Sequence, residues 1–145
     1  MSARRIREAR RSGKIALVVH PSLETLASFQ AVLTKNEFVA IIARDLPTAL
    51  LAITQHRLDV AIVSSRIQEG GDGWALAGVI HLACPEAFVC VTSATDPDIF
   101  ILQAAINNGA REVYLESNPA SEIVKSILSH IDPAAQKKAS EDRVQ

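Results

Sequence analysis

The sequence predicts an α/β domain with three layers, in which helices cover both faces of a doubly wound, five-stranded parallel sheet. Five short apolar segments alternate along the chain with segments of helical period. These apolar segments are continuous, as strands buried on both faces are, and do not alternate with polar residues. The 145 residues are 48% hydrophobic and only 4% aromatic, so we expect one mainly aliphatic core.

The first half of the chain supplies two strands and two helices. Residues 15–19 are a continuous apolar run, and residues 38–43 form the second predicted strand. Ser22 can cap the helix between these strands, and Asp45 can cap the next one, which has Pro47 in its first turn. The predicted inward stripes of the two helices are Leu23, Leu26, Phe29 and Leu33, then Leu46, Leu50 and Ile53.

The second half supplies three strands, at residues 60–63, 88–92 and 113–115, each followed by a helix. Glycines at 70, 71 and 73 predict a mobile loop before the first of these helices, which stops before Pro85. Gly109 ends the helix opened by Asp96-Pro97-Asp98, and Asn118-Pro119 opens the last one, which ends near Ile131. The predicted inward residues are Leu76, Val79 and Ile80, then Leu102, Ala105 and Ile106, and finally Ile123, Ile127 and Leu128.

Crossovers between parallel strands are right-handed. About 120 residues with this alternation of strands and helices fit the flavodoxin-like strand order 2-1-3-4-5. Ligand sites of such folds lie at the carboxyl ends of the strands. Here those ends carry four polar pairs, namely His20-Pro21, Ser64-Ser65, Thr92-Ser93 and Glu116-Ser117.

The chain divides into a basic arm at residues 1–13, the domain at 14–131 and a polar tail or linker at 132–145. The arm can contact nucleic acid or an acidic partner, or it can simply be solvated. No apolar run approaches the ~20 residues of a membrane span, so we expect no membrane contact. Two cysteines without metal or redox spacing, and no targeting signal, predict a reduced cytoplasmic protein.

Several segments, in this order, resemble the receiver (CheY-like) domain of two-component response regulators over residues 14–131. They are the first strand and its helix, Leu58–Val63 leading to Asp72-Gly73, Val91-Thr92-Ser93-Ala94, and Ala105-Ile106-Asn-Asn-Gly109-Ala110. The resemblance implies a signalling module with protein partners, either a kinase or a regulatory target.

The chain departs from that family at the positions that handle phosphate. The family has two adjacent carboxylates after its first strand, where this chain has His20-Pro21. Its phosphorylated aspartate, seven residues before the Asp-Gly pair, corresponds to Ser65, next to Ser64. Its lysine, seven residues after the Gly of Gly-Ala, corresponds to Glu116, whereas the hydroxyl residue is retained as Thr92.

These residue types predict a degenerate phosphorylation pocket. Magnesium prefers carboxylate oxygens, and a serine hydroxyl is a weak nucleophile without an activating base. We therefore expect a pseudo-receiver that lacks aspartyl phosphorylation, a metal, a cofactor and catalysis, and that acts by protein contact. Two alternatives stay open. One is the N-terminal regulatory domain of a longer DNA-binding regulator, and the other is a small-anion-gated switch that uses Ser65, Thr92 and His20.

An apolar surface is predicted on the fourth helix, where Ile99-Phe100-Ile101-Leu102 are four large apolar residues in a row. Phe100, Ile101 and Tyr114 are the candidate interface. The receiver resemblance implies a homodimer or target contact through the fourth helix, fifth strand and fifth helix. Nucleic acid is expected as a partner only through the basic arm or through an output domain.

Overall fold

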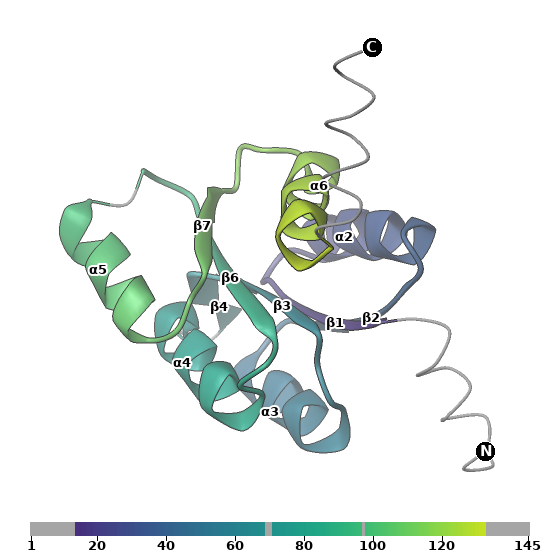
Figure 1. Cartoon of the computed structure of the whole chain (residues 1–145), viewed down its shortest axis with the longest axis horizontal. Coiled ribbons are helices and arrows are strands. Elements are labelled where there is room, and N and C mark those ends of the chain that lie inside the picture. The colour runs from purple at the N-terminus through teal and green to yellow at the C-terminus, as the bar shows by residue number, and fades with distance from the viewer. Residues whose placement is uncertain (1–13, 69–70, 97, 133–145) are drawn as a thin grey trace.

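The computed structural model describes residues 14–68, 71–96 and 98–132, which form a three-layer α/β/α domain (Figure 1). All five strands of the main sheet are parallel, in the order β2-β1-β3-β6-β7. Because these are the second, first, third, fourth and fifth predicted strands, the predicted topology is confirmed. The strands are β1 (Lys14–Val19), β2 (Phe38–Ala43), β3 (Val60–Ser64), β6 (Phe88–Ser93) and β7 (Glu112–Leu115).

Helices cover the two faces of this sheet unequally, as Figure 1 shows. One face packs against α2 and α6, and the other carries α3, α4 and α5. Their bounds are α2 (Leu23–Lys35), α3 (Leu46–Gln55), α4 (Gly73–Ala83), α5 (Ile99–Asn107) and α6 (Ala120–Ile131). The sheet therefore separates two apolar clusters, one on each of its faces.

The predicted helix boundaries are confirmed where a cap is visible. The side chains of Ser22, Asp45 and Asp98 accept hydrogen bonds from the backbone N–H groups of Thr25, Thr48 and Ile101. Gly109 follows α5 with a φ of 87°, a conformation that glycine adopts without steric cost. These local signals depend on neighbouring residues only, so the sequence is sufficient to locate them.

The predicted inward stripes are partly wrong. In α3, α4 and α5, the residues that the sheet buries include Ala49, Ala52, Ala77 and Ala105. Small side chains let these helices approach the sheet closely, which turns several larger residues toward solvent. The residues predicted to face inward that are exposed are Leu23, Leu46, Leu50, Val79, Leu102 and Ile106.

The glycine-rich segment contains more structure than the predicted loop. Strands β4 (Arg66–Ile67) and β5 (Gly71–Asp72) form a small antiparallel pair directly after β3. Residues 69 and 70 between them lie outside the described residues. Asp72 then caps α4 by accepting hydrogen bonds from Trp74 N–H and Ala75 N–H.

The predicted basic arm at residues 1–13 lies outside the described residues, as does the predicted tail from residue 133 onward. Among the described residues, the first strand begins at Lys14 and the last helix ends at Ile131. Within the described residues, every helix is too short or too polar to cross a membrane.

Candidate functional site

Four polar side chains meet at the carboxyl edge of the sheet, and all of them come from positions just after or at the end of a strand. Ser64 and Thr92 face each other across β3 and β6. His20 follows β1, and its backbone N–H donates a hydrogen bond to the Ala43 carbonyl. Glu116 follows β7, and its N–H donates to the Ser93 carbonyl. These four strand ends therefore lie together at one edge of the sheet.

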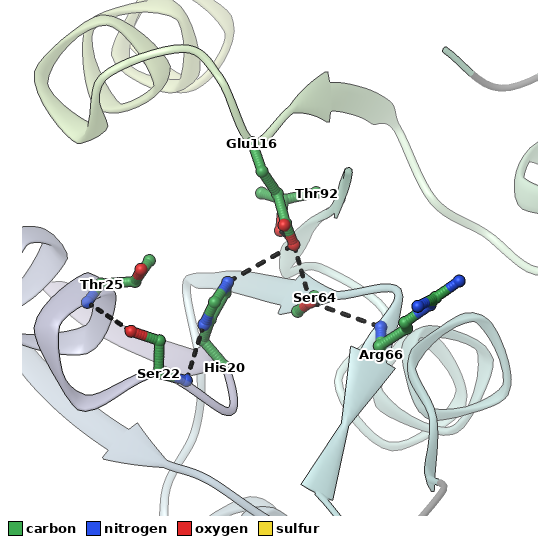
Figure 2. A network of polar contacts seen from close by, with 7 residues as sticks. All are labelled: His20, Ser22, Thr25, Ser64, Arg66, Thr92 and Glu116. Carbon is green, nitrogen blue, oxygen red and sulfur yellow. Dashed lines mark hydrogen bonds and ion pairs between the residues drawn. The ribbon is translucent and has the colours of Figure 1, made fainter. Parts of the chain in front are cut away.

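Glu116 is the centre of this group, as Figure 2 shows. Its Oε1 atom accepts hydrogen bonds from the Ser64 hydroxyl at 2.8 Å and from the Thr92 hydroxyl at 3.3 Å. The same oxygen lies 3.4 Å from His20 Nε2. Three potential donors therefore converge on one carboxylate oxygen, and they supply the stabilisation that a half-buried charge needs.

His20 is held as the neutral tautomer that carries its proton on Nε2. Its Nδ1 accepts a hydrogen bond of 3.0 Å from the Ser22 backbone N–H, so that nitrogen is unprotonated (Figure 2). Burial lowers the pKa of His20 below its usual value, and the opposing effect of Glu116 is smaller. The Nε2–H group then points to Glu116, and the contact is one between a neutral donor and a carboxylate.

Ser64, rather than Ser65, supplies the hydroxyl that contacts Glu116. The Ser64 hydroxyl also accepts a hydrogen bond of 3.3 Å from the Arg66 N–H. Ser65 instead makes backbone hydrogen bonds, from its N–H to the Thr92 carbonyl and from the Gly73 N–H to its own carbonyl. Successive strand residues point to opposite faces, so only one of the two serines can face the side that holds Glu116.

Pro21 contributes its backbone to the neighbouring loop, since its carbonyl accepts a hydrogen bond of 3.1 Å from Arg44 Nε. Of the nearby acidic residues in the sequence, Asp72 caps α4, and Glu69 lies outside the described residues.

A cavity of about 250 Å³ adjoins this network between the sheet edge and the helices α2 and α6. Its lining includes one carboxylate and no lysine or arginine. The lining residues are His20, Thr25, Ser28, Phe29, Thr92, Glu116, Asn118, Ala120 and Ile123. Because His20 is neutral, the Glu116 carboxylate gives the cavity lining a negative charge. This charge disfavours a bound anion and favours a small polar or cationic ligand.

Sequence reasoning named His20, Thr92 and Glu116, but it did not identify Ser22, Thr25 or Arg66 as supports of the network. Ser22 bonds His20 and also accepts from the Thr25 N–H, so one residue both begins α2 and orients the imidazole. The capping signal at Ser22 pointed to the helix start, and nothing in the sequence linked it to His20.

The described residues hold no cluster of three or more His, Cys, Asp or Glu side chains that could bind a metal ion. Their buried side-chain nitrogen and oxygen atoms all have hydrogen-bond partners. The polar network is thus internally complete in this part of the chain.

The predicted interface residues do not form one patch. Phe100 is 78% exposed on α5, and Ile101 is exposed beside it. Tyr114 packs against the cluster on the opposite face of the sheet, where its hydroxyl lies 2.9 Å from the Ser126 hydroxyl. Burial raises the pKa of Tyr114 to about 12. Strand alternation explains the separation, because Val113 faces the α5 side and Tyr114 faces away from it.

No family model matches the chain, and no curated protein matches it. Solved structures do. A response regulator from Thermotoga maritima is 25% identical, with a TM-score of 0.68 over 81% of this chain and 98% of the other.

Two further structures are similar at lower identity. A CheY-like receiver domain protein from Methanospirillum hungatei JF-1 is 17% identical, with a TM-score of 0.76 over 87% of this chain and 99% of the other. A response regulator from Burkholderia pseudomallei, solved with a phosphorylated aspartic acid, is 16% identical, with a TM-score of 0.73 over 88% and 74%.

The chain has a receiver-domain fold. The strand order supports this assignment. So do the Thermotoga maritima and Methanospirillum hungatei structures, which the match covers to 98% and 99% of their length. Within this receiver fold, the polar network lies at the end of the sheet where the sequence placed the degenerate phosphorylation pocket.

Proposed function

We propose that the protein is a pseudo-receiver, a regulatory module that acts through protein contacts and not through aspartyl phosphorylation. Its partner would be a kinase or a regulatory target protein of a two-component-type pathway. The proposal includes no enzymatic step and no cofactor. It also covers the case in which the module is the regulatory part of a longer DNA-binding protein.

The position of the Glu116 carboxylate is the observation that carries this proposal. The Ser64 and Thr92 hydroxyls donate to it, so the donors that could stabilise an incoming phosphoryl group are already engaged. A phosphoryl group here would meet a carboxylate at close range, and like charges repel strongly in a half-buried site. No aspartate takes part in the network, so the usual carboxylate nucleophile is also missing from it.

The same observation argues against the small-anion switch through Ser65, Thr92 and His20. Thr92 is bonded to Glu116, Ser65 makes only the backbone bonds described above, and His20 is neutral. An anion at the Ser64 and Thr92 hydroxyls would have to displace Glu116, which already accepts hydrogen bonds from both.

Phosphorylation can be tested directly by incubating the full chain with acetyl phosphate and Mg²⁺ and measuring its intact mass. We expect no added phosphoryl group, whereas the Burkholderia pseudomallei regulator, treated in parallel, serves as the positive control. A stable adduct on this chain, mapped to Ser64, Ser65 or His20, would refute the proposal.

A further inference from the structure

The helices α3, α4 and α5 are uncharged along their length, although Asp45, Asp72 and Asp98 cap their N-termini. These helices have 10, 11 and 9 residues, and none of these residues is Asp, Glu, Lys or Arg. The two helices on the other face differ, because α2 carries Glu24 and Lys35, and α6 carries Glu122 and Lys125. The helices on one face of the sheet therefore lack charged residues, whereas those on the other face carry them. Figure 1 shows which helices lie on each face.

Large apolar side chains are exposed on this same face, which we call the neutral face. Of the twelve large hydrophobic residues exposed in the described chain, ten lie on α3, α4 and α5. The exceptions are Leu23 on α2 and Val39 on β2. The ten are Leu46, Leu50, Leu51, Val79, Leu82, Ile99, Phe100, Ile101, Leu102 and Ile106. Such clustering marks an interaction surface, whereas single exposed apolar residues do not.

Helix α5 packs weakly against the rest of the described domain. It has nine residues, and only Ala105 is buried. Isolated helices of this length are marginal in water, and most helical stability in proteins comes from packing of an apolar face. The Asp98 cap and Gly109 help at the ends, but Ile99, Phe100 and Ile106 contribute almost nothing while they are exposed. A partner that covers α5 would provide the missing packing.

We infer that the partner of the neutral face is a second copy of this chain. A two-fold contact brings the same patch of both subunits together, so a charge close to the axis lies near its own like charge. Helices without charged residues avoid that repulsion. Homodimer interfaces are also more apolar than contacts between unlike proteins, and resemble a core cut in half. A membrane surface is a poorer match, since interfacial helices carry lysine and arginine.

This inference deepens the proposed function by naming the contact through which the module acts. It differs from the homodimer expected at the sequence level, which would use α5, β7 and α6. The described structure favours the other side of α5, because α6 carries the charges listed above and Tyr114 is turned away.

The test is the mass of the full chain in solution, measured by light scattering after size exclusion and by sedimentation over a range of concentrations. We expect a dimer for the wild type and loss of the dimer for Leu82→Glu and for Ile106→Glu. Leu82 is 80% exposed and Ile106 is 70% exposed, so both variants should fold, which circular dichroism would verify. Leu23→Glu is the matched control, since it makes the same change at a 59% exposed leucine on α2, and it should remain a dimer.

Four results would overturn the inference. A wild-type monomer at every concentration would do so, as would a dimer that survives both variants. Dissociation by Lys125→Glu, with Leu82→Glu still dimeric, would move the interface to α5, β7 and α6. If a monomeric wild type sedimented with phosphatidylcholine–phosphatidylglycerol vesicles, the face would be a membrane surface. None of these measurements depends on the phosphoryl-adduct assay, so the two proposals can fail separately.

Discussion

At the scale of single residues, His20 shows how a backbone donor decides the chemistry of an imidazole. The Ser22 N–H occupies Nδ1, so protonation of the ring would break this bond or move the loop. Burial acts in the same direction and lowers the pKa of His20. Both effects keep the ring neutral near pH 7, despite the carboxylate beside it.

Acid should therefore destabilise the protein through His20. Because the folded pKa lies below that of the unfolded chain, the unfolded state binds more protons between these two values. Stability is fully present above about pH 6.5 and falls as the pH drops toward the folded pKa, by at most about 1.4 kcal/mol per pH unit.

Urea unfolding at several pH values between 5 and 7.5 would measure this slope. His20→Asn keeps an acceptor near the Nδ1 position but cannot titrate, so it should show a flatter slope at a lower overall stability. An identical slope in the two proteins would contradict this account of His20.

Glu116 should raise the pKa of His20, whereas burial lowers it. Its charge and its contact with Nε2 both raise the pKa of His20, against the effect of burial. Glu116→Gln removes the charge and nearly preserves the shape, so the pKa of His20 should fall further. Titration of the His20 ring by NMR would show this shift.

Glu112→Gln is the control for that experiment. Glu112 is a partly buried carboxylate of β7 that lies 3.4 Å from His130, and it makes no contact with His20. It should leave the His20 titration unchanged. A His20 pKa that rises in Glu116→Gln, or that moves equally in both variants, would show that Glu116 is not the specific partner.

At the scale of elements, the junction between β3 and α4 is the tightest point near the site. A Cβ atom added to Gly73 would lie 1.7 Å from the Ser64 carbonyl oxygen, which belongs to the backbone and cannot move aside cheaply. Gly78, in the same helix, has no neighbouring atom closer than 3.5 Å to such a Cβ. One helix thus contains a glycine that is required and one that is not.

Alanine at these two glycines should have opposite effects on the free energy of unfolding. Gly73→Ala should lower it by at least about 2 kcal/mol, because the backbone must shift. Gly78→Ala should raise it by roughly 0.5–1 kcal/mol, because alanine loses less entropy in a helix. Chemical denaturation of both variants would measure the difference, and equal effects would show that the close approach at Gly73 is unimportant.

The side of a helix that packs on the sheet is not predicted correctly for α3, α4 and α5. The helical spacing of Leu46, Leu50 and Ile53 predicts that all three face the core. Instead Ala49 and Ala52 are buried, and the two leucines are exposed. When we infer the buried side of a helix from its sequence pattern, we assign the large apolar residues to it and overlook small ones such as alanine. When most of a helix is apolar, as in α3 to α5, this pattern cannot select which side meets the sheet.

At the scale of the whole molecule, the two faces of the sheet carry different kinds of side chain. The α2/α6 face holds the closed polar network, in which Glu116 engages the Ser64 and Thr92 hydroxyls. The α3/α4/α5 face holds the exposed apolar side chains. A regulatory module that works by contact needs a rigid scaffold and an unpartnered surface, and the sheet keeps these two properties on opposite sides.

The amino-acid sequence alone determined the fold class, the strand order, the helix caps and the four strand ends that form the site. The elements and caps depend on local sequence pattern, and the strand order follows from the rules for connecting strands that alternate with helices. Only the tertiary structure decided that Ser64 contacts Glu116, that Ser22 sets the tautomer of His20, and that α5 remains uncovered. Strand register and helix rotation produce these contacts, and both result from packing between segments that are distant in the chain.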